Sequence, residues 1–300
     1  MVRYRRSITQ AIAIMIGSLA TSVASLPVIA DEPPVDDRKQ SAITPVEGVV
    51  RLFDGHSTDG LDTWLKDLKS EDPNDVFRVT DGMLHITGNG LGAIYTRERY
   101  RDYHLILEYK WGSRTWHDRR NSARDSGLLV HSNGKCGGYY GIWMPSLEVN
   151  IIEGGVGDLV FVPGDDIAGR PVPLSLSVDV SRDRDQEVVW DELGKRESFD
   201  LQNLSRINWR DRDPDWNDKI GFRGQNDNDS LFGQWTRIDV LTDDGHIEVH
   251  VNGVKVNEAF DASPSEGQIQ LQSEFAEIFF RRWELWPIND GPDIGPVQQE

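Results

Sequence analysis

Short runs in which apolar and polar residues alternate are the feature of this sequence that most restricts its fold. In HLILEYKW, residues 104–111, one face carries Leu105, Leu107, Tyr109 and Trp111. The same period of two appears in HIEVHVNGVKV, residues 246–256, where Asn252-Gly253 suits a tight hairpin turn. Further runs of this kind are MLHIT, GLLVH, LEVNII, TRIDVL, QIQLQ and EIFFRRWEL. The sequence therefore predicts an all-β fold, an antiparallel β-sandwich or jelly roll in a single domain.

Residues 1–30 have the pattern of a secretory signal peptide. Three arginines, at positions 3, 5 and 6, precede the apolar run AIAIMIGSLA, and Val28-Ile29-Ala30 offers the small residues that a signal peptidase reads. The run is interrupted by Ser and Thr and is shorter than the roughly 20 apolar residues of a membrane span, which argues against an uncleaved anchor. Arg5-Arg6 suggests the twin-arginine route as a further alternative. We expect export to the periplasm or the extracellular space, with no integral membrane span after processing.

The rest of the chain divides by composition. Residues 31–45, DEPPVDDRKQSAITP, are polar, proline-bearing and aperiodic, which is typical of a linker. The domain is expected over 46–288, and residues 289–300 have the composition of a tail. Within the domain, residues from about 160 to 233 are rich in Asp and Arg and less regular, so we expect an insertion of long loops with a few strands.

The charge and the single cysteine exclude several classes of protein. The chain has 32 Lys+Arg against 50 Asp+Glu, a net charge of −18. Without the three arginines of the predicted signal peptide, 29 basic residues face 50 acidic ones, a net charge of −21. Such a field repels nucleic acid and anionic lipid but leaves a neutral ligand such as a sugar unaffected. Cys136 is alone, so an intrachain disulfide is excluded and the fold must be stabilised by its core.

The stretch SLEVNIIEGGVGD, residues 146–158, places acidic and amide side chains on a strand that should be buried. Alternation turns its apolar residues to the core and Glu148 and Asn150 to the opposite, concave face. On a regular strand Glu153 points to the core side, whereas a one-residue bulge near Ile151-Ile152 would return it to the face of Glu148. The strand is therefore the candidate for a catalytic or binding site.

Several stretches in order resemble the 3-keto-disaccharide hydrolase domain, a secreted family with a concanavalin-like jelly roll. They are RLFDGHSTDGLDTW, FRVTDGMLHITG, YRDYHLILEYKW, SGLLVHSNG, SLEVNIIEGG, QWTRIDVLTDDGHIEVHVNGVKV and GQIQLQSEFAEIFFRRWEL. The resemblance covers about 46–156 and 220–288. The sequence departs from the family pattern in two places: Asp125-Ser126-Gly127 stands for the usual Asn-Ser-Gly, and Asn150 for a frequent Gln.

The resemblance implies cleavage of a glycoside whose glucose ring carries a ketone at carbon 3. The ketone acidifies the hydrogen on carbon 2, so a general base can remove it and expel the group on carbon 1 by elimination, after which water adds. We expect Glu148 to be the base, with His131 assisting it or binding a metal. Lys135, Arg223 or a divalent ion such as calcium would stabilise the enolate. An upstream glycoside 3-oxidase would supply the substrate.

Two other functions remain open on the sequence. If the strand is bulged, Glu148 and Glu153 give the Glu-x-Asn-x-x-Glu spacing of a retaining β-glucanase, with the two carboxyl groups about 5–5.5 Å apart. Alternatively, the same face serves a carbohydrate-binding module without turnover. The substitution Glu148→Gln separates enzyme from binder, because it removes a base and leaves most sugar contacts.

Aromatic residues are the candidates for sugar contact, because a flat ring stacks on the C–H face of a sugar. We expect this role for Trp111 and Trp143, and for Tyr140 in the glycine-rich segment KCGGYYGIWM, residues 135–144, which would form a wall of the cleft. Asn150 would join Glu148 in binding. Tryptophans 116, 209 and 216 are further candidates, whereas 64, 235 and 283 are expected in the core.

A metal site is only weakly indicated. Alternating acids at 211–217 begin like a calcium loop, but Trp216 stands where the turn needs glycine and Phe222 where the closing Glu belongs. This excludes a helix-loop-helix calcium site and leaves an irregular loop or solvated turns. The histidines at 85, 104, 246 and 250 are expected to be satisfied or at the surface.

Overall fold

The computed structural model describes residues 41–299, which belong to a single compact unit. The predicted signal peptide and most of the predicted linker lie outside this range. Within it, no helix is long and apolar enough to cross a membrane. The one 3-10 helix used below, η2 (His117–Arg120), follows the longest strand.

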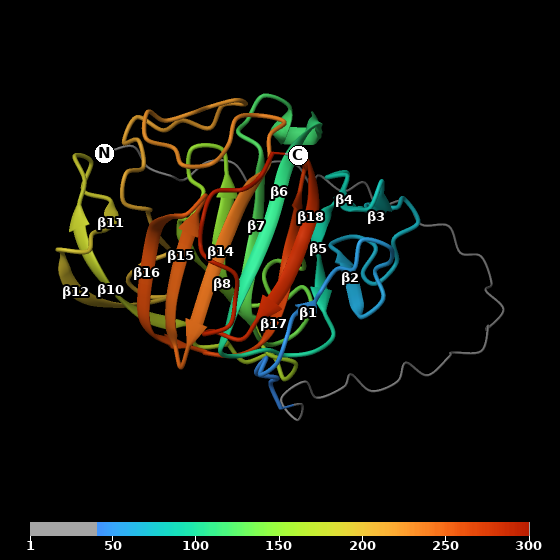
Figure 1. The fold of residues 1–300 in the computed structure, drawn as a ribbon, viewed down its shortest axis with the longest axis horizontal. Coiled ribbons are helices and arrows are strands. Elements are labelled where there is room, and N and C mark those ends of the chain that lie inside the picture. Colours follow the sequence, from blue (N-terminus) through green and yellow to red (C-terminus); the bar gives the residue numbers. More distant parts are fainter. Residues whose placement is uncertain (1–40, 300) are drawn as a thin grey trace, which may run out of the picture. The chain divides into compact units, whose positions relative to one another are not determined.

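Residues 41–299 form two antiparallel sheets (Figure 1). The larger has eleven strands in the order β11 (Val188–Trp190), β10 (Ser175–Arg182), β16 (Val254–Ser263), β15 (His246–Val251), β14 (Thr236–Asp243), β6 (Tyr103–Thr115), β18 (Ala276–Trp286), β4 (Met83–Ile86) and β3 (Phe77–Thr80), with β1 (Val50–Arg51) on β18 and β12 (Lys195–Asp200) on β10. The smaller has seven in the order β13 (Arg206–Ile207), β9 (Leu159–Val162), β8 (Ser146–Ile152), β7 (Asp125–Ser132), β17 (Gln268–Glu274), β5 (Leu91–Thr96) and β2 (Leu61–Leu65).

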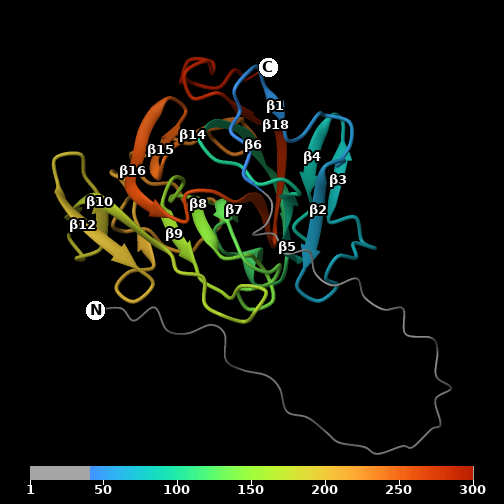
Figure 2. The ribbon, with the colours of Figure 1, turned by 90° about the horizontal axis from the view of Figure 1, so that it is seen from below.

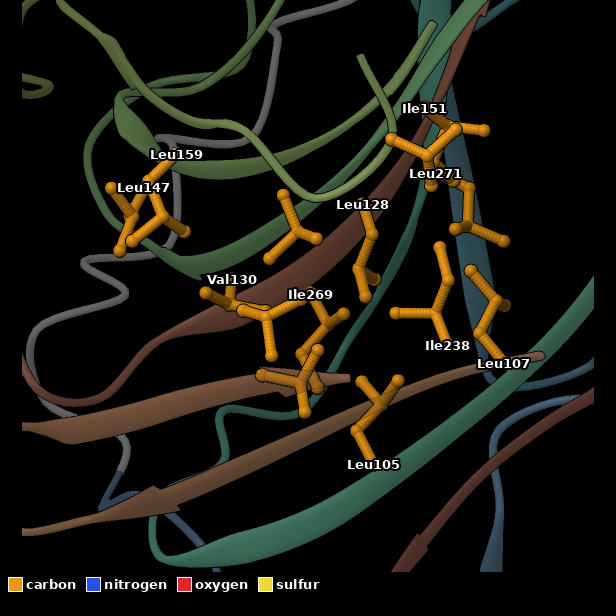
Figure 3. Packing of buried hydrophobic residues seen from close by; sticks show 14 of the residues in the cluster. Leu105, Leu107, Leu128, Val130, Leu147, Ile151, Leu159, Ile238, Ile269 and Leu271 are labelled. Carbon is orange, nitrogen blue, oxygen red and sulfur yellow. The ribbon is translucent and has the colours of Figure 1, made fainter. Parts of the chain in front are cut away.

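The two sheets form separate layers with the main apolar core between them. Strands β7, β8 and β9 lie on one side and β14, β15 and β16 on the other (Figure 2). Side chains of both sheets point toward each other, as Leu105 and Ile238 of the larger sheet do toward Leu128 and Ile269 of the smaller (Figure 3). The jelly-roll sandwich expected from the alternating runs is confirmed: two antiparallel sheets enclose the core, and strands such as β6 and β8 turn every second residue into this layer.

The middle of the chain is more regular than its composition indicates. Residues 160–233 contain most of β9 and the whole of β10–β13, and these strands extend both sheets of the sandwich. The longest irregular parts are the segments between β9 and β10 and between β13 and β14. The C-terminal residues also pack on the domain, since Arg237 donates to the Asp293 carbonyl at 3.1 Å and the Gln299 side chain pairs with the Trp235 backbone.

Strand β8 alternates as expected. Leu147, Val149 and Ile151 belong to the core, and Glu148 and Asn150 therefore face away from it. Its pairing with β7 follows one continuous register from Val130↔Leu147 to Asp125↔Ile152. The bulge that would return Glu153 to the face of Glu148 is thus not formed in this stretch.

Candidate active site

Three carboxyl groups converge on the outer face of the smaller sheet. Glu148 of β8 lies beside Leu129 of β7, and Asp125 begins β7 on the same face. The register of β17 pairs Leu271 with Leu128, so alternation places Glu274 beside Asp125. We call Asp125, Glu148 and Glu274 the acidic cluster. Three different strands supply it, so the sheet register determines its geometry.

Gly127 makes the close approach of these side chains possible. It lies between Asn150 and Gln272 on the outer face, and a Cβ atom there would be 2.4 Å from Gln272 Oε1 and 2.5 Å from Glu148 Oε1. Real Cβ atoms do not approach other heavy atoms so closely. The missing side chain is therefore the space in which the Glu148 carboxyl group and the Gln272 amide meet.

Two arginines neutralise part of the cluster. Arg119 of η2 forms ion pairs with Asp125 and Glu274, the latter at 3.1 Å, and reaches Asp218 at 3.5 Å. Arg206 of β13 pairs with Val160, which is also the partner of Glu148, so Arg206 and Glu148 flank one residue of β9. Arg119 contacts the carboxylates of Asp125 and Glu274 directly, so the negative charge of Glu148 is the least compensated of the three.

Burial and mutual repulsion raise the pKa of the acidic cluster. Burial, and then the charges of Glu274 and Asp125, raise the pKa of Glu148 well above its ordinary value, and Arg206 and Gln272 oppose this only in part. Burial and Asp125 raise the pKa of Glu274 to about 8 against the effect of Arg119, and burial raises the pKa of Asp125. The cluster therefore retains a proton at neutral pH, the condition in which neighbouring carboxyl groups divide acid and base roles.

The segment of residues 135–145, here named the cover loop, forms an apolar lid over part of this face. Trp143 Nε1 donates to the Gly92 carbonyl at 2.8 Å, and the Met144 amide donates to Gln270 Oε1 at 3.3 Å. Together with Leu129 and other residues, Trp143 forms a second, smaller apolar cluster. This cluster excludes water beside Glu148, which is 7% exposed, and so contributes to its raised pKa.

Polar atoms of the site lack complete partners. Asn150 Oδ1 is buried without a hydrogen bond among the described residues. Gln272 lies near enough to favour the charged form of Glu148, yet neither of its amide atoms has a well-formed hydrogen bond within residues 41–299. Buried amides are normally satisfied, so exceptions beside a carboxyl group are typical of a site prepared for a ligand.

His131 lies away from the acidic cluster, contrary to the expected role beside Glu148. Its backbone has φ +52° where the register of β7 and β17 shifts, and its ring packs edge-on at 6.3 Å from the Tyr103 ring of the larger sheet. Burial lowers its pKa to about 4. The register shift turns the side chain toward the core layer, which sequence alternation does not foresee.

Glu153 has a structural environment. Its carboxylate accepts from Arg124 Nη1 at 2.7 Å, from the Arg124 amide at 2.9 Å and from the Gly221 amide at 2.8 Å. The structure thus does not bring it together with Glu148, because the regular strand leaves the two residues on opposite sides. A retaining pair of Glu148 and Glu153 has no geometric support.

The expected binding residues are dispersed. Trp111 belongs to the main core at 6% exposure, and the indole of Trp143 packs from the cover loop onto the sheet and donates to the Gly92 carbonyl, so neither ring is free to stack on a sugar. Lys135 is exposed, and Arg223 pairs with Asp229 at 3.2 Å outside the acidic cluster. Of the three expected aromatic contacts, Tyr140 has the expected exposure, since it is 76% exposed on the cover loop with φ +48°.

The alternating acids at 211–217, for which an irregular calcium loop or solvated turns remained open, form contacts with other residues. Asp215 pairs with Arg184 at 2.7 Å, and Asp213 accepts from the Asp215 amide. Among residues 41–299, His246, Glu248 and Glu258 have atoms close enough to share an ion. Lys255 Nζ lies 3.1 Å from Glu258 and 3.6 Å from Glu248, so its ammonium group already forms an ion pair with each of these carboxylates.

Sequence reasoning missed Asp125, Glu274, Gln272, Arg119 and the nearby Tyr139 as site residues. For two of them, Gln272 and Glu274, the sequence itself contained an indication. QIQLQSE carries polar side chains at every second position of a central strand, the same anomaly that pointed to Glu148.

The ring of Tyr139 stacks on Trp143 at 5.8 Å, and the pKa of Tyr139 is raised by burial and, more weakly, by Tyr140, Glu274 and Glu148.

The fold and this site define a concanavalin-like jelly roll with a buried acidic cluster on the outer face of one sheet. The chain belongs to the family of the 3-keto-alpha-glucoside-1,2-lyase-like domain, whose model matches residues 48–285. The matched range includes the middle segment that the resemblance had left unassigned. No curated protein matches the sequence.

Several solved structures are similar at low identity. A candidate glycosyl hydrolase from Parabacteroides distasonis is 16% identical with a TM-score of 0.46, over 80% of this chain and 94% of that chain. The carbohydrate binding module CBM66 from Bacillus subtilis is 11% identical with a TM-score of 0.41, over 75% and 94%. The VIP36 exoplasmic/lumenal domain, in a form bound to Ca2+ and Man3GlcNAc, is 10% identical with a TM-score of 0.40, over 85% and 99%.

Proposed function

We propose that this protein is an exported enzyme that cleaves the glycosidic bond of a 3-keto-glycoside by elimination and hydration. The observation that carries the proposal is the acidic cluster, in which Glu148 is buried, has a raised pKa and faces incompletely satisfied amides. A carboxylate with a raised pKa is a stronger base near neutral pH than an ordinary one, which suits removal of a proton acidified by a neighbouring ketone.

The proposed reaction uses two carboxyl groups. The Glu148 carboxylate takes the proton from carbon 2, and the electron pair moves onto the ketone oxygen as an enolate. The enolate then expels the oxygen on carbon 1 and forms a carbon 1–carbon 2 double bond. In the form of the coupled cluster that reacts, Glu148 is ionised and Glu274, whose pKa is raised to about 8, is protonated and donates its proton to the leaving oxygen. Water adds across the double bond and restores a 3-keto sugar.

The negative charge that develops on the ketone oxygen must be stabilised by a hydrogen-bond donor. Gln272 and Arg206 are the nearest candidates, because Gln272 meets Glu148 over Gly127 and Arg206 acts on the pKa of Glu148. They take the place of Lys135 and Arg223, which lie elsewhere. The carboxylates are also ligands that a hard divalent ion prefers, although Arg119 already pairs with two of them.

The decisive experiment compares matched β-glucosides with and without the 3-keto group, using the processed chain, Glu148→Gln and a chelator-treated sample. We expect turnover of the keto substrate alone, reduced about 10²–10⁴-fold in Glu148→Gln, with sugar affinity within a few-fold. Turnover of the unoxidised glucoside would replace the proposal with an ordinary glycosidase. Binding without turnover of either substrate would indicate a carbohydrate-binding module.

The pH dependence gives a second test. As a base, Glu148 must be ionised, so the rate is expected to rise with pH through a pKa well above 4.5. Because Glu274 must be protonated, the rate is expected to fall again as the pH passes about 8. The two ionisations belong to a coupled cluster, so the profile reports apparent values. A rate independent of pH from 5 to 9 would contradict these roles.

A further inference from the structure

A pocket of about 240 Å³ lies at the other end of β7 from the acidic cluster. It is lined by Asn133, directly after β7, and by residues of the segment 166–173 and of the turn at Ser263-Pro264. Asp125 begins β7, so at about 3.3 Å per residue the pocket is roughly 25 Å from that carboxylate. We name it the end pocket. The distance makes it a site separate from the acidic cluster.

The end pocket has a buried donor without a partner. Arg99 is 6% exposed, and its Nη2 donates to Glu266 Oε1 at 3.3 Å. Its Nε is buried and has no hydrogen bond among the described residues. A buried guanidinium donor left unpaired is costly, and Arg99 is one of the residues that line the end pocket.

Other polar groups of the end pocket are fixed in place. Asn133 Nδ2 donates to the His131 carbonyl at 2.9 Å and to the Glu266 carbonyl at 2.7 Å. The Asp166 carboxylate receives Arg170 Nε at 3.0 Å and Nη2 at 2.7 Å. These contacts hold an amide and a carboxylate at the pocket before any ligand arrives, which lowers the entropy cost of binding.

The remaining wall is apolar and rigid. Ile167 and Val172 line it together with three prolines, at 171, 173 and 264. The charges around the pocket balance, since Arg99 and Arg170 face Glu266 and Asp166. The charged lining residues are one arginine and one carboxylate, Arg99 and Asp166, and both already have a partner of opposite charge. An anion would meet no surplus of positive charge there in a chain of net charge −18, so the lining favours a neutral ligand.

We propose that the end pocket binds one neutral hexose ring. The apolar wall receives the C–H face of the ring, and Arg99, Asn133 and Asp166 bond its hydroxyl groups. The volume is below the roughly 300 Å³ at which ligand pockets usually begin, so one ring fits and a disaccharide does not. The choice of a sugar rests on the proposed function, whereas the pocket and its polar groups do not.

Titration of the 15N-labelled domain with D-glucose, followed by NMR, tests the proposal. We expect shifts of the Gly134, Ile167 and Val172 amides in the wild type and in Glu148→Gln alike. Ile167→Trp fills the pocket and is expected to lower the affinity at least tenfold. Val254→Trp, at an exposed position of β16, is the matched control and should bind as the wild type does.

The outcomes separate the two proposals. Pocket shifts that persist in Ile167→Trp, or their absence in the wild type at millimolar glucose, would overturn the end pocket while leaving turnover of keto-glycosides unaffected. Tighter binding of the anion benzoate than of glucose at the same amides would overturn the proposal that the pocket prefers a neutral ligand. Full turnover in Glu148→Gln with intact pocket shifts would instead overturn the proposed function alone.

Discussion

At the scale of single residues, the position of the Glu148 carboxyl group depends on the absence of a side chain at Gly127. Gly127→Ala places a methyl group within 2.5 Å of both the Glu148 and the Gln272 side-chain oxygens. Both are far ends of flexible side chains, so the domain should fold while the carboxyl group moves by about 1 Å. We expect turnover of the keto substrate to fall about 10²-fold, because such a displacement misaligns the base.

Gly295→Ala is the matched control for Gly127→Ala, since a Cβ at Gly295 meets no atom within 4 Å. Thermal melts followed by circular dichroism show whether both variants fold. Unchanged turnover in Gly127→Ala would mean that the position of the Glu148 carboxyl group does not matter for the reaction.

The raised pKa of Glu148 also predicts a pH-dependent stability. A carboxyl group with a folded pKa above its unfolded value stabilises the fold below about pH 4.5 and loses this effect as the pH rises through the folded pKa. Glu148→Gln removes the ionisation. We expect the Tm of Glu148→Gln to exceed that of the wild type by several degrees at pH 9 and to match it near pH 5.

Calorimetric melts at four pH values between 5 and 9 measure this difference. Asp54→Asn, at a surface loop, serves as a control with a pKa lowered by backbone hydrogen bonds from Ser57 and His56. A stability difference that does not grow with pH would show that Glu148 is ionised at little cost in the folded protein.

At the scale of the strand, the regularity of β8 decides the role of Glu153. The side chains of Glu153 and Arg124 are 8% and 9% exposed, and their ion pair anchors the end of β8 to the segment before β7. Removing one partner of such a buried pair usually costs 3–5 kcal/mol. We therefore expect Glu153→Gln to lower the free energy of unfolding by about 3 kcal/mol.

Glu153→Gln should retain the kcat of the wild type below its melting temperature, measured on the keto substrate. This separates it from Glu148→Gln, which is predicted to lose turnover without becoming less stable than the wild type. A large loss of kcat in folded Glu153→Gln would revive the pair of Glu148 and Glu153.

At the scale of the whole molecule, the net charge of −18 determines how the salt concentration affects ligand binding. A neutral sugar carries no charge for the field of the protein to attract or repel. We expect its affinity to change less than about twofold between 50 and 500 mM NaCl in titration calorimetry. A steep decrease with salt would indicate an ionic ligand and contradict a neutral sugar at either site.

The sequence by itself determined the layer architecture and the direction of each β8 side chain. Alternation with a period of two has one solution when a sheet buries one face, so Glu148 and Asn150 had to face away from Leu147 and Val149. The unusual polar residues on a strand expected to be buried could also be recognised from the sequence, both in β8 and in QLQSE.

Only the tertiary structure decided which side chains meet. Asp125, Glu148 and Glu274 lie far apart in the sequence, and their proximity follows from the register of β7, β8 and β17. The register shift at His131 and the burial of Trp143 against the smaller sheet depend on neighbours that a local pattern does not contain. Local periodicity fixes the face of a strand, whereas register and loop packing, set by long-range contacts, determine the partners on that face.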